Sequence, residues 1–112
     1  MKKTTSNSEH YGWGTGCEGW HLLQRDDLSV IQERVPPGES ETLHYHNKAR
    51  QFFYILRGQA VIVIAGERVA LRASDGIEIP PGTPHQFRNE SEAMVELLVI
   101  SMPKSHGDRV NT

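Results

Sequence analysis

The stretch that decides the fold is PGESETLHYHNKARQFFYILRG, residues 37–58. Two histidines stand one residue apart near its centre, and Gln51 opens an aromatic run five residues after the second histidine. Side chains two positions apart on a β-strand share a face, so His44 and His46 point the same way. On a helix the same pair would diverge by roughly 160° and could not reach one ion. If the short loop at 47–50 closes a hairpin, Gln51 comes beside the two histidines, at a spacing typical of metal ligands.

Short strand-like runs, separated by turn residues, continue on both sides of this stretch. Residues 28–35 end at Pro36, Pro37 and Gly38, where proline fixes φ and glycine takes its positive values. Residues 59–72 indicate a hairpin. Further strand-like runs lie at 77–79, 85–89 and 93–101. No window of about eleven residues has the period of an amphipathic helix, so the pattern predicts an all-β barrel or sandwich.

The composition limits what the chain can be. Its 112 residues suit one domain, and its one cysteine, Cys17, cannot form an internal disulfide. Twelve basic and 14 acidic residues give a net charge of −2, which favours no polyanion, so we expect no nucleic-acid partner. The two lysines near the start precede no apolar run, so we predict neither an export signal nor a membrane span and expect a cytoplasmic protein.

We divide the chain into three parts. Residues 28–103 form the predicted barrel. Residues 1–27 form an N-terminal segment, partly ordered, that packs on the barrel or on a partner. Its glycine- and tryptophan-rich run at 11–21 is either a flap over the barrel mouth or a packing element at a sheet edge, and we favour packing. Residues 104–112 are predicted to be a solvated tail.

Two runs are apolar without interruption, namely AVIVIA at 60–65 and LLVI at 97–100. A strand with one face in water should alternate between apolar and polar residues, so the outer face of these strands should be covered. One hypothesis is a second copy of the chain, which makes the protein a homodimer. The other is that the N-terminal segment folds back over them. We favour the homodimer.

A third histidine, His85, follows the turn PPGTP and shares a strand face with Phe87. On the preceding strand Ile77 and Ile79 face one side and Glu78 the other. A small barrel has an apolar interior, so we expect the isoleucines to point inward and the glutamate outward.

The segments GESETLHYHNKARQFFYILRG, residues 38–58, and PPGTPHQFRN, residues 80–89, resemble the two signature motifs of the cupin superfamily. The resemblance implies a jelly-roll β-barrel, or double-stranded β-helix, with one divalent metal ion inside. Matching the motifs position by position places the metal ligands at His44, His46, Gln51 and His85. Two positions depart from the pattern: Ser74 stands where glycine is usual, and Gln51 where glutamate is commonest.

The glutamine changes the expected chemistry. Three neutral imidazoles and a neutral amide leave a divalent ion at its full charge, so the ion binds less tightly but prefers an anionic partner. Gln51 also cannot act as a general base. A metal-free barrel is the alternative, but three histidines buried without partners would be destabilising, so we favour metal binding. The ligands accept Fe, Mn, Ni, Co or Zn, and the sequence does not choose among them.

Two functional hypotheses follow from the resemblance. The first is an enzyme that acts on an anionic or sugar-like small molecule, by dioxygenase-like or isomerase-like chemistry. The second is a non-catalytic cupin that binds a small molecule or a metal and works through a partner protein. The fold does not decide between them. In either case the expected pocket wall is apolar and consists of Phe53, Ile55, Ile77, Ile79 and Phe87.

Overall fold

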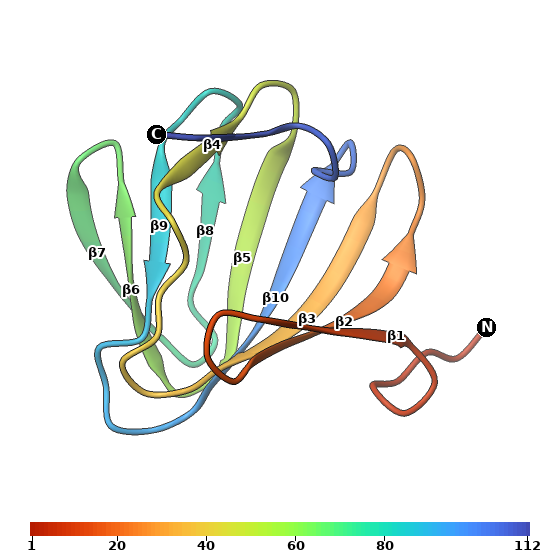
Figure 1. The fold of residues 1–112 in the computed structure, drawn as a ribbon, viewed down its shortest axis with the longest axis horizontal. Coiled ribbons are helices and arrows are strands. Elements are labelled where there is room, and N and C mark those ends of the chain that lie inside the picture. The colour runs from red at the N-terminus through yellow and green to blue at the C-terminus, as the bar shows by residue number, and fades with distance from the viewer.

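The computed structural model describes residues 1–112 and contains eleven β-strands and no helix. Two antiparallel sheets face each other and enclose a barrel (Figure 1). The strands are β1 (Glu9–Trp13), β2 (Cys17–Gln24), β3 (Ser29–Val35), β4 (His44–His46), β5 (Arg50–Arg57), β6 (Gln59–Ile64), β7 (Glu67–Arg72), β8 (Gly76–Ile79), β9 (His85–Arg88), β10 (Val95–Met102) and β11 (Arg109–Asn111). The predicted all-β, double-stranded β-helix class is confirmed.

The chain passes back and forth between the two sheets. One sheet has the order β1-β2-β3-β10-β5-β8, and the other has the order β11-β4-β9-β6-β7. From β3 to β10 the chain changes sheet at almost every step, so residues distant in sequence meet on facing walls. No helix is present that could span a membrane.

The hydrophobic core lies between the sheets and follows the period of two. On β10 the residues Val95, Leu97 and Val99 are buried, whereas the residues between them are only partly buried. Ile55, which pairs with Leu97 on the neighbouring strand β5, and Ile62 from β6 are fully buried beside them. The apolar run 97–100 therefore divides between an inner face and an outer face.

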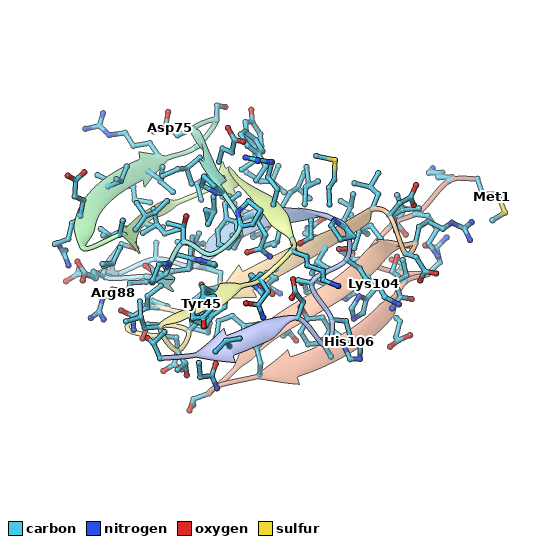
Figure 2. The ribbon with its side chains drawn as sticks, turned by 90° about the horizontal axis from the view of Figure 1, so that it is seen from above. Met1, Tyr45, Asp75, Arg88, Lys104 and His106 are labelled. Carbon is cyan, nitrogen blue, oxygen red and sulfur yellow. The ribbon has the colours of Figure 1, made fainter.

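Both ends of the chain contribute strands. The N-terminal segment forms the hairpin β1–β2, which continues the six-stranded sheet at the edge of β3 and does not lie over its outer face. The C-terminal segment, which we expected to be solvated, folds back and pairs as β11 with β4. Figure 2 shows this segment from above, with His106 near one end of it and Tyr45 on the neighbouring strand. The pairing satisfies backbone groups that a free tail would leave to water.

Candidate metal centre

Three histidines converge inside the barrel because β4 and β9 are neighbours in one sheet. His44 and His46 share the inner face of β4, and His44 pairs directly with His85 on β9. The three rings are 3%, 6% and 0% exposed, and one potential ligand nitrogen from each lies within 4.8 Å of the other two. This is the spacing at which three nitrogens can share one ion.

Gln51 approaches from the opposite wall. The sequence suggested that β4 and β5 form a hairpin, but this is wrong, because the two strands belong to different sheets and do not pair. The loop after β4 crosses from one sheet to the other, and Gln51 then lines the same cavity as His44 and His46. The glutamine is buried, at 5% exposed.

Hydrogen bonds fix the orientation of these side chains. Nδ1 of His44 donates to the carbonyl of Thr42 at 2.6 Å, and Nδ1 of His85 donates to the carbonyl of Thr83 at 3.0 Å. A carbonyl can only accept, so both rings are held with a lone pair on Nε2. Such carbonyl contacts are the usual outer partners of metal-binding histidines.

Around the three histidines, several buried polar atoms have no hydrogen-bond partner. They are Nε2 of His85, both ring nitrogens of His46, and Oε1 of Gln51. The amide nitrogen of Gln51 donates to Ser101 Oγ at 3.0 Å, which leaves the carbonyl oxygen free. Buried polar atoms are normally paired, and those that are not reduce stability by about 1–3 kcal/mol each. All of these free atoms are good metal donors, so the residues fit a divalent metal ion.

Burial keeps the histidines neutral. It lowers the pKa of His44 to about 4, and it lowers the pKa of His46 and His85 as well. Neighbouring imidazoles and the guanidinium of Arg109 act in the same direction on His44. Neutral imidazole is the form that binds a metal, so the cluster is ready to bind at neutral pH. A divalent ion held by His44, His46, His85 and Gln51 would supply Lewis-acid charge to a ligand oxygen.

The C-terminal segment supports the loop between β4 and β5. The carboxylate of Asp108 accepts the backbone N–H groups of Asn47, Lys48 and Ala49, at 3.2, 2.9 and 2.9 Å. These bonds lower the pKa of Asp108. No local sequence pattern indicates this contact, because about sixty residues separate its partners.

His44 and His46 line a cavity of about 250 Å³. Of the predicted apolar wall, only Phe53 lines it. Ile55, Ile79 and Phe87 belong to the buried core, and Ile77 packs against that core. Glu78 is exposed and pairs with an arginine outside the barrel.

Much of the rest of the cavity wall consists of polar residues that the sequence pattern did not assign to the site. Among them are Tyr11 from β1, Glu33 from β3, Glu41 from the loop before β4, and Arg109 from β11. The Tyr11 hydroxyl donates to Glu33 Oε2 at 2.8 Å, and Glu41 Oε1 accepts the backbone N–H of Phe87 at 3.0 Å. Burial raises the pKa of Glu33 to about 7 and the pKa of Glu41 to about 8. Carboxyl groups perturbed in this way are typical of active sites.

A second cavity, of about 590 Å³, adjoins the first. The two share Tyr11, Ile31, Ser105 and His106 as lining residues. His21 from β2 lines this outer cavity and packs against Tyr11 with ring centroids 5.0 Å apart. The histidine cluster thus lies behind a wider outer cavity lined mainly by polar and charged residues.

Proteins of known sequence resemble this chain over most of its length. An uncharacterized protein of Methanocaldococcus jannaschii is 33% identical over 81 residues, which are 71% of this chain and 65% of that protein. The oxalate-binding protein of Thermotoga maritima is 31% identical over 85 residues, or 71% of this chain and 70% of that protein. In two further relatives the match spans 51% of the relative's own length.

Solved structures share the fold. KdgF from a Halomonas species superposes with a TM-score of 0.85 over 93% of this chain and 94% of that one, at 18% identity. A family model described as a cupin domain matches residues 31–101. The chain therefore belongs to the cupin family.

Proposed function

We propose that this protein is a metal-dependent enzyme that acts on a small anionic or sugar-like molecule. The observation that carries the proposal is the cluster of three buried histidines beside Gln51, in which His46, His85 and Gln51 have buried donor atoms without partners. His44, His46 and Gln51 also line a cavity that a ligand can enter. A divalent cation held by His44, His46, His85 and Gln51 would satisfy these unpaired donor atoms and would supply Lewis-acid charge to a substrate oxygen. Arg109 lines the same cavity and supplies positive charge for an anionic substituent.

The first test is metal binding. Protein purified without a histidine tag should contain, or take up on titration, one equivalent of a divalent transition metal, measured by elemental analysis and calorimetry. His46→Ala should lower the affinity at least 100-fold, because one neutral donor of four is lost. His10→Ala, on the exposed face of β1, is the matched control and should bind like the wild type. Absence of stoichiometric metal in the wild type would overturn the proposal.

The second test is turnover. The metal-loaded protein is incubated with a panel of hexose phosphates, which reports isomerisation, and with dicarbonyl compounds in an oxygen electrode, which reports oxygenation. A non-catalytic role is the second candidate, and the oxalate-binding protein of Thermotoga maritima favours it by its name. Tight binding of a panel compound without any chemical change would support that candidate.

The protein also presents an outer face suited to a second copy of itself. Cross-strand pairing aligns Phe52, Ile100 and Val30 in one row across three strands, next to a parallel row that includes Leu98. Beside these rows Glu96 forms ion pairs with arginines on both neighbouring strands. An apolar centre with a rim of alternating charge can match its own twofold copy, so we propose a homodimer through this face.

Light scattering after gel filtration checks the homodimer. The expected mass is twice that of the chain, and Leu98→Lys should reduce it to the monomer. Val63→Lys, on the outer face of the other sheet, should leave the dimer intact. A wild-type protein with the monomer mass would contradict the proposal.

A further inference from the structure

One row of residues crosses three neighbouring strands next to the metal centre. Tyr11 on β1 lies opposite Gly19 on β2, and Gly19 lies opposite Glu33 on β3. The phenol reaches over the middle strand, and its hydroxyl donates to Glu33 Oε2 at 2.8 Å. Figure 1 shows the three strands side by side at one edge of the barrel.

This contact depends on the glycine. A Cβ atom added to Gly19 would lie 2.2 Å from Cζ of Tyr11 and 2.4 Å from its hydroxyl oxygen. No real side chain tolerates that distance, so any other residue would push the ring away from Glu33. The strand interior thus carries glycine, a residue unfavourable in strands, at the one place where the phenol crosses.

Tyr11 and Glu33 face the cavity in which a substrate would bind. Tyr11 and Glu33 line the same cavity as His44, His46 and Gln51. The hydrogen bond from Tyr11 occupies one carboxylate oxygen of Glu33, and no group of the chain donates to the other. Imidazoles that hold a metal ion cannot accept a proton, and Gln51 has no titratable group, so the four ligand residues offer no general base. Glu33 lines the same cavity and has a free carboxylate oxygen that can take this role.

We propose that Glu33 is the general base and acid of the cavity and that Tyr11, lying over Gly19, is its positioning residue. The inference rests on the proposed function. The inference narrows the substrate to an α-hydroxy carbonyl compound, in which the carbon next to the carbonyl group carries both a hydrogen and a hydroxyl group. The reaction is proton transfer, as in an aldose–ketose isomerisation.

The step is balanced without any oxidant. The Glu33 carboxylate removes the hydrogen from the carbon as a proton, and the electron pair of that C–H bond moves toward the carbonyl to give an enolate. The Glu33 carboxylic acid then returns the proton to the neighbouring carbon, while the hydroxyl proton moves between the two oxygens. The net change is the migration of hydrogen within one molecule. Arg109 lines the same cavity and stabilises the negative charge that develops on oxygen, and a cation held by the histidines would add to this effect.

The surroundings of Glu33 suit this exchange. Burial raises its pKa to about 7, so the group can both take and return a proton near neutrality. The groups that face it are Tyr11, Glu41 and Arg109; the Tyr11 hydrogen bond and the Arg109 charge limit the rise in its pKa. Burial and the Glu33 charge raise the pKa of Tyr11, so the phenol stays protonated and remains a donor.

Kinetics give the first test, with the hexose phosphate of the panel that is isomerised fastest. Glu33→Gln should lower kcat by about 10²- to 10⁴-fold with metal content and KM unchanged. Glu67→Gln, at an exposed hairpin tip, is the matched control for loss of one carboxylate. A Glu33→Gln protein with bound metal and a kcat within threefold of the wild type overturns the inference but leaves the proposed function standing, whereas a wild type without metal overturns the proposed function.

A second readout needs neither metal nor substrate. Carbon NMR on protein labelled at the glutamate carboxyl follows the Glu33 resonance, assigned by its loss in Glu33→Gln. It should titrate near neutrality. Tyr11→Phe should raise its pKa because the hydrogen bond to the charged form is lost, and Gly19→Ala should do the same by displacing the ring. An ordinary carboxyl pKa in the wild type, or no change in both variants, overturns the inference.

Discussion

The two ends of the barrel are built from the same strands but from different residues. Along β5 the inward residues change from Gln51 at the mouth, through Phe53, to Ile55 at the base. Along β10 the inward residue is Ser101 at the mouth and Leu97 at the base. The base is a packed aliphatic core, whereas the mouth buries polar atoms around a hollow. The base stabilises the fold, and the mouth lowers its stability in favour of a binding site.

Two buried amides show the same difference in detail. Asn89, near the base, is 1% exposed and fully bonded: its Nδ2 donates to the carbonyls of Val35 and Ala93, and its Oδ1 accepts from the backbone and hydroxyl of Ser91. Gln51 is 5% exposed, yet its carbonyl oxygen has no partner. The amide of Asn89 makes all its hydrogen bonds within the chain, as a structural residue does. The carbonyl oxygen of Gln51 has no such bond and is available to a ligand.

The largest expected effect lies at the base. Ile55→Ala should lower the free energy of unfolding of the metal-free protein by about 3–4 kcal/mol, because the side chain is fully buried and its loss leaves a cavity. Gln51→Met, at the mouth of the same strand, should change it by only about 1 kcal/mol, because the loss of the hydrogen bond to Ser101 Oγ is partly offset by the removal of an amide oxygen that had no partner. Urea denaturation measures both, and equal losses would show that the two ends do not differ.

A smaller effect, on metal affinity, is expected when a negative charge is introduced at the mouth. Gln51→Glu should bind Zn²⁺ or Mn²⁺ at least tenfold more tightly, about 1.4 kcal/mol, because an anionic donor replaces a neutral one. A chelator competition at neutral pH measures this, with Gln59→Glu, exposed at the start of β6, as the charge control. An unchanged affinity in the Gln51 variant would mean that this position does not contribute a ligand.

The sequence was informative where chemistry is local. The strand period placed His44 and His46 on one face, and the motif spacing brought in His85 from another strand. It failed at the crossing between sheets, because a four-residue connection is compatible with a hairpin and with a passage to the facing wall. The resemblance supplied Gln51 for the site despite that error.

The rest of the cavity wall could not be predicted from the sequence. Tyr11 and Glu33 are 22 positions apart and meet only because Gly19 leaves space between them. Asp108 bonds a loop about sixty positions away. A glutamate on a strand and a tyrosine among glycines are most simply interpreted as surface residues. No local sequence pattern distinguishes such a surface residue from one that lines a cavity.

The smallest predicted effect concerns stability against pH at the mouth. The folded-state pKa of Glu33, about 7, lies above the ordinary carboxyl value, so the folded protein holds this proton more tightly than the unfolded chain does. The wild type therefore loses stability as the pH rises from about 4.5 through about 7. Glu33→Gln has no proton to lose, so its stability relative to the wild type should be about 1 kcal/mol higher at about pH 8 than at about pH 4.5, a value reduced because the carboxyl is partly open to the cavity. Urea denaturation of the metal-free proteins at both values measures this. The same offset at both would show that Glu33 ionises as an ordinary surface carboxylate and that the mouth does not destabilise it.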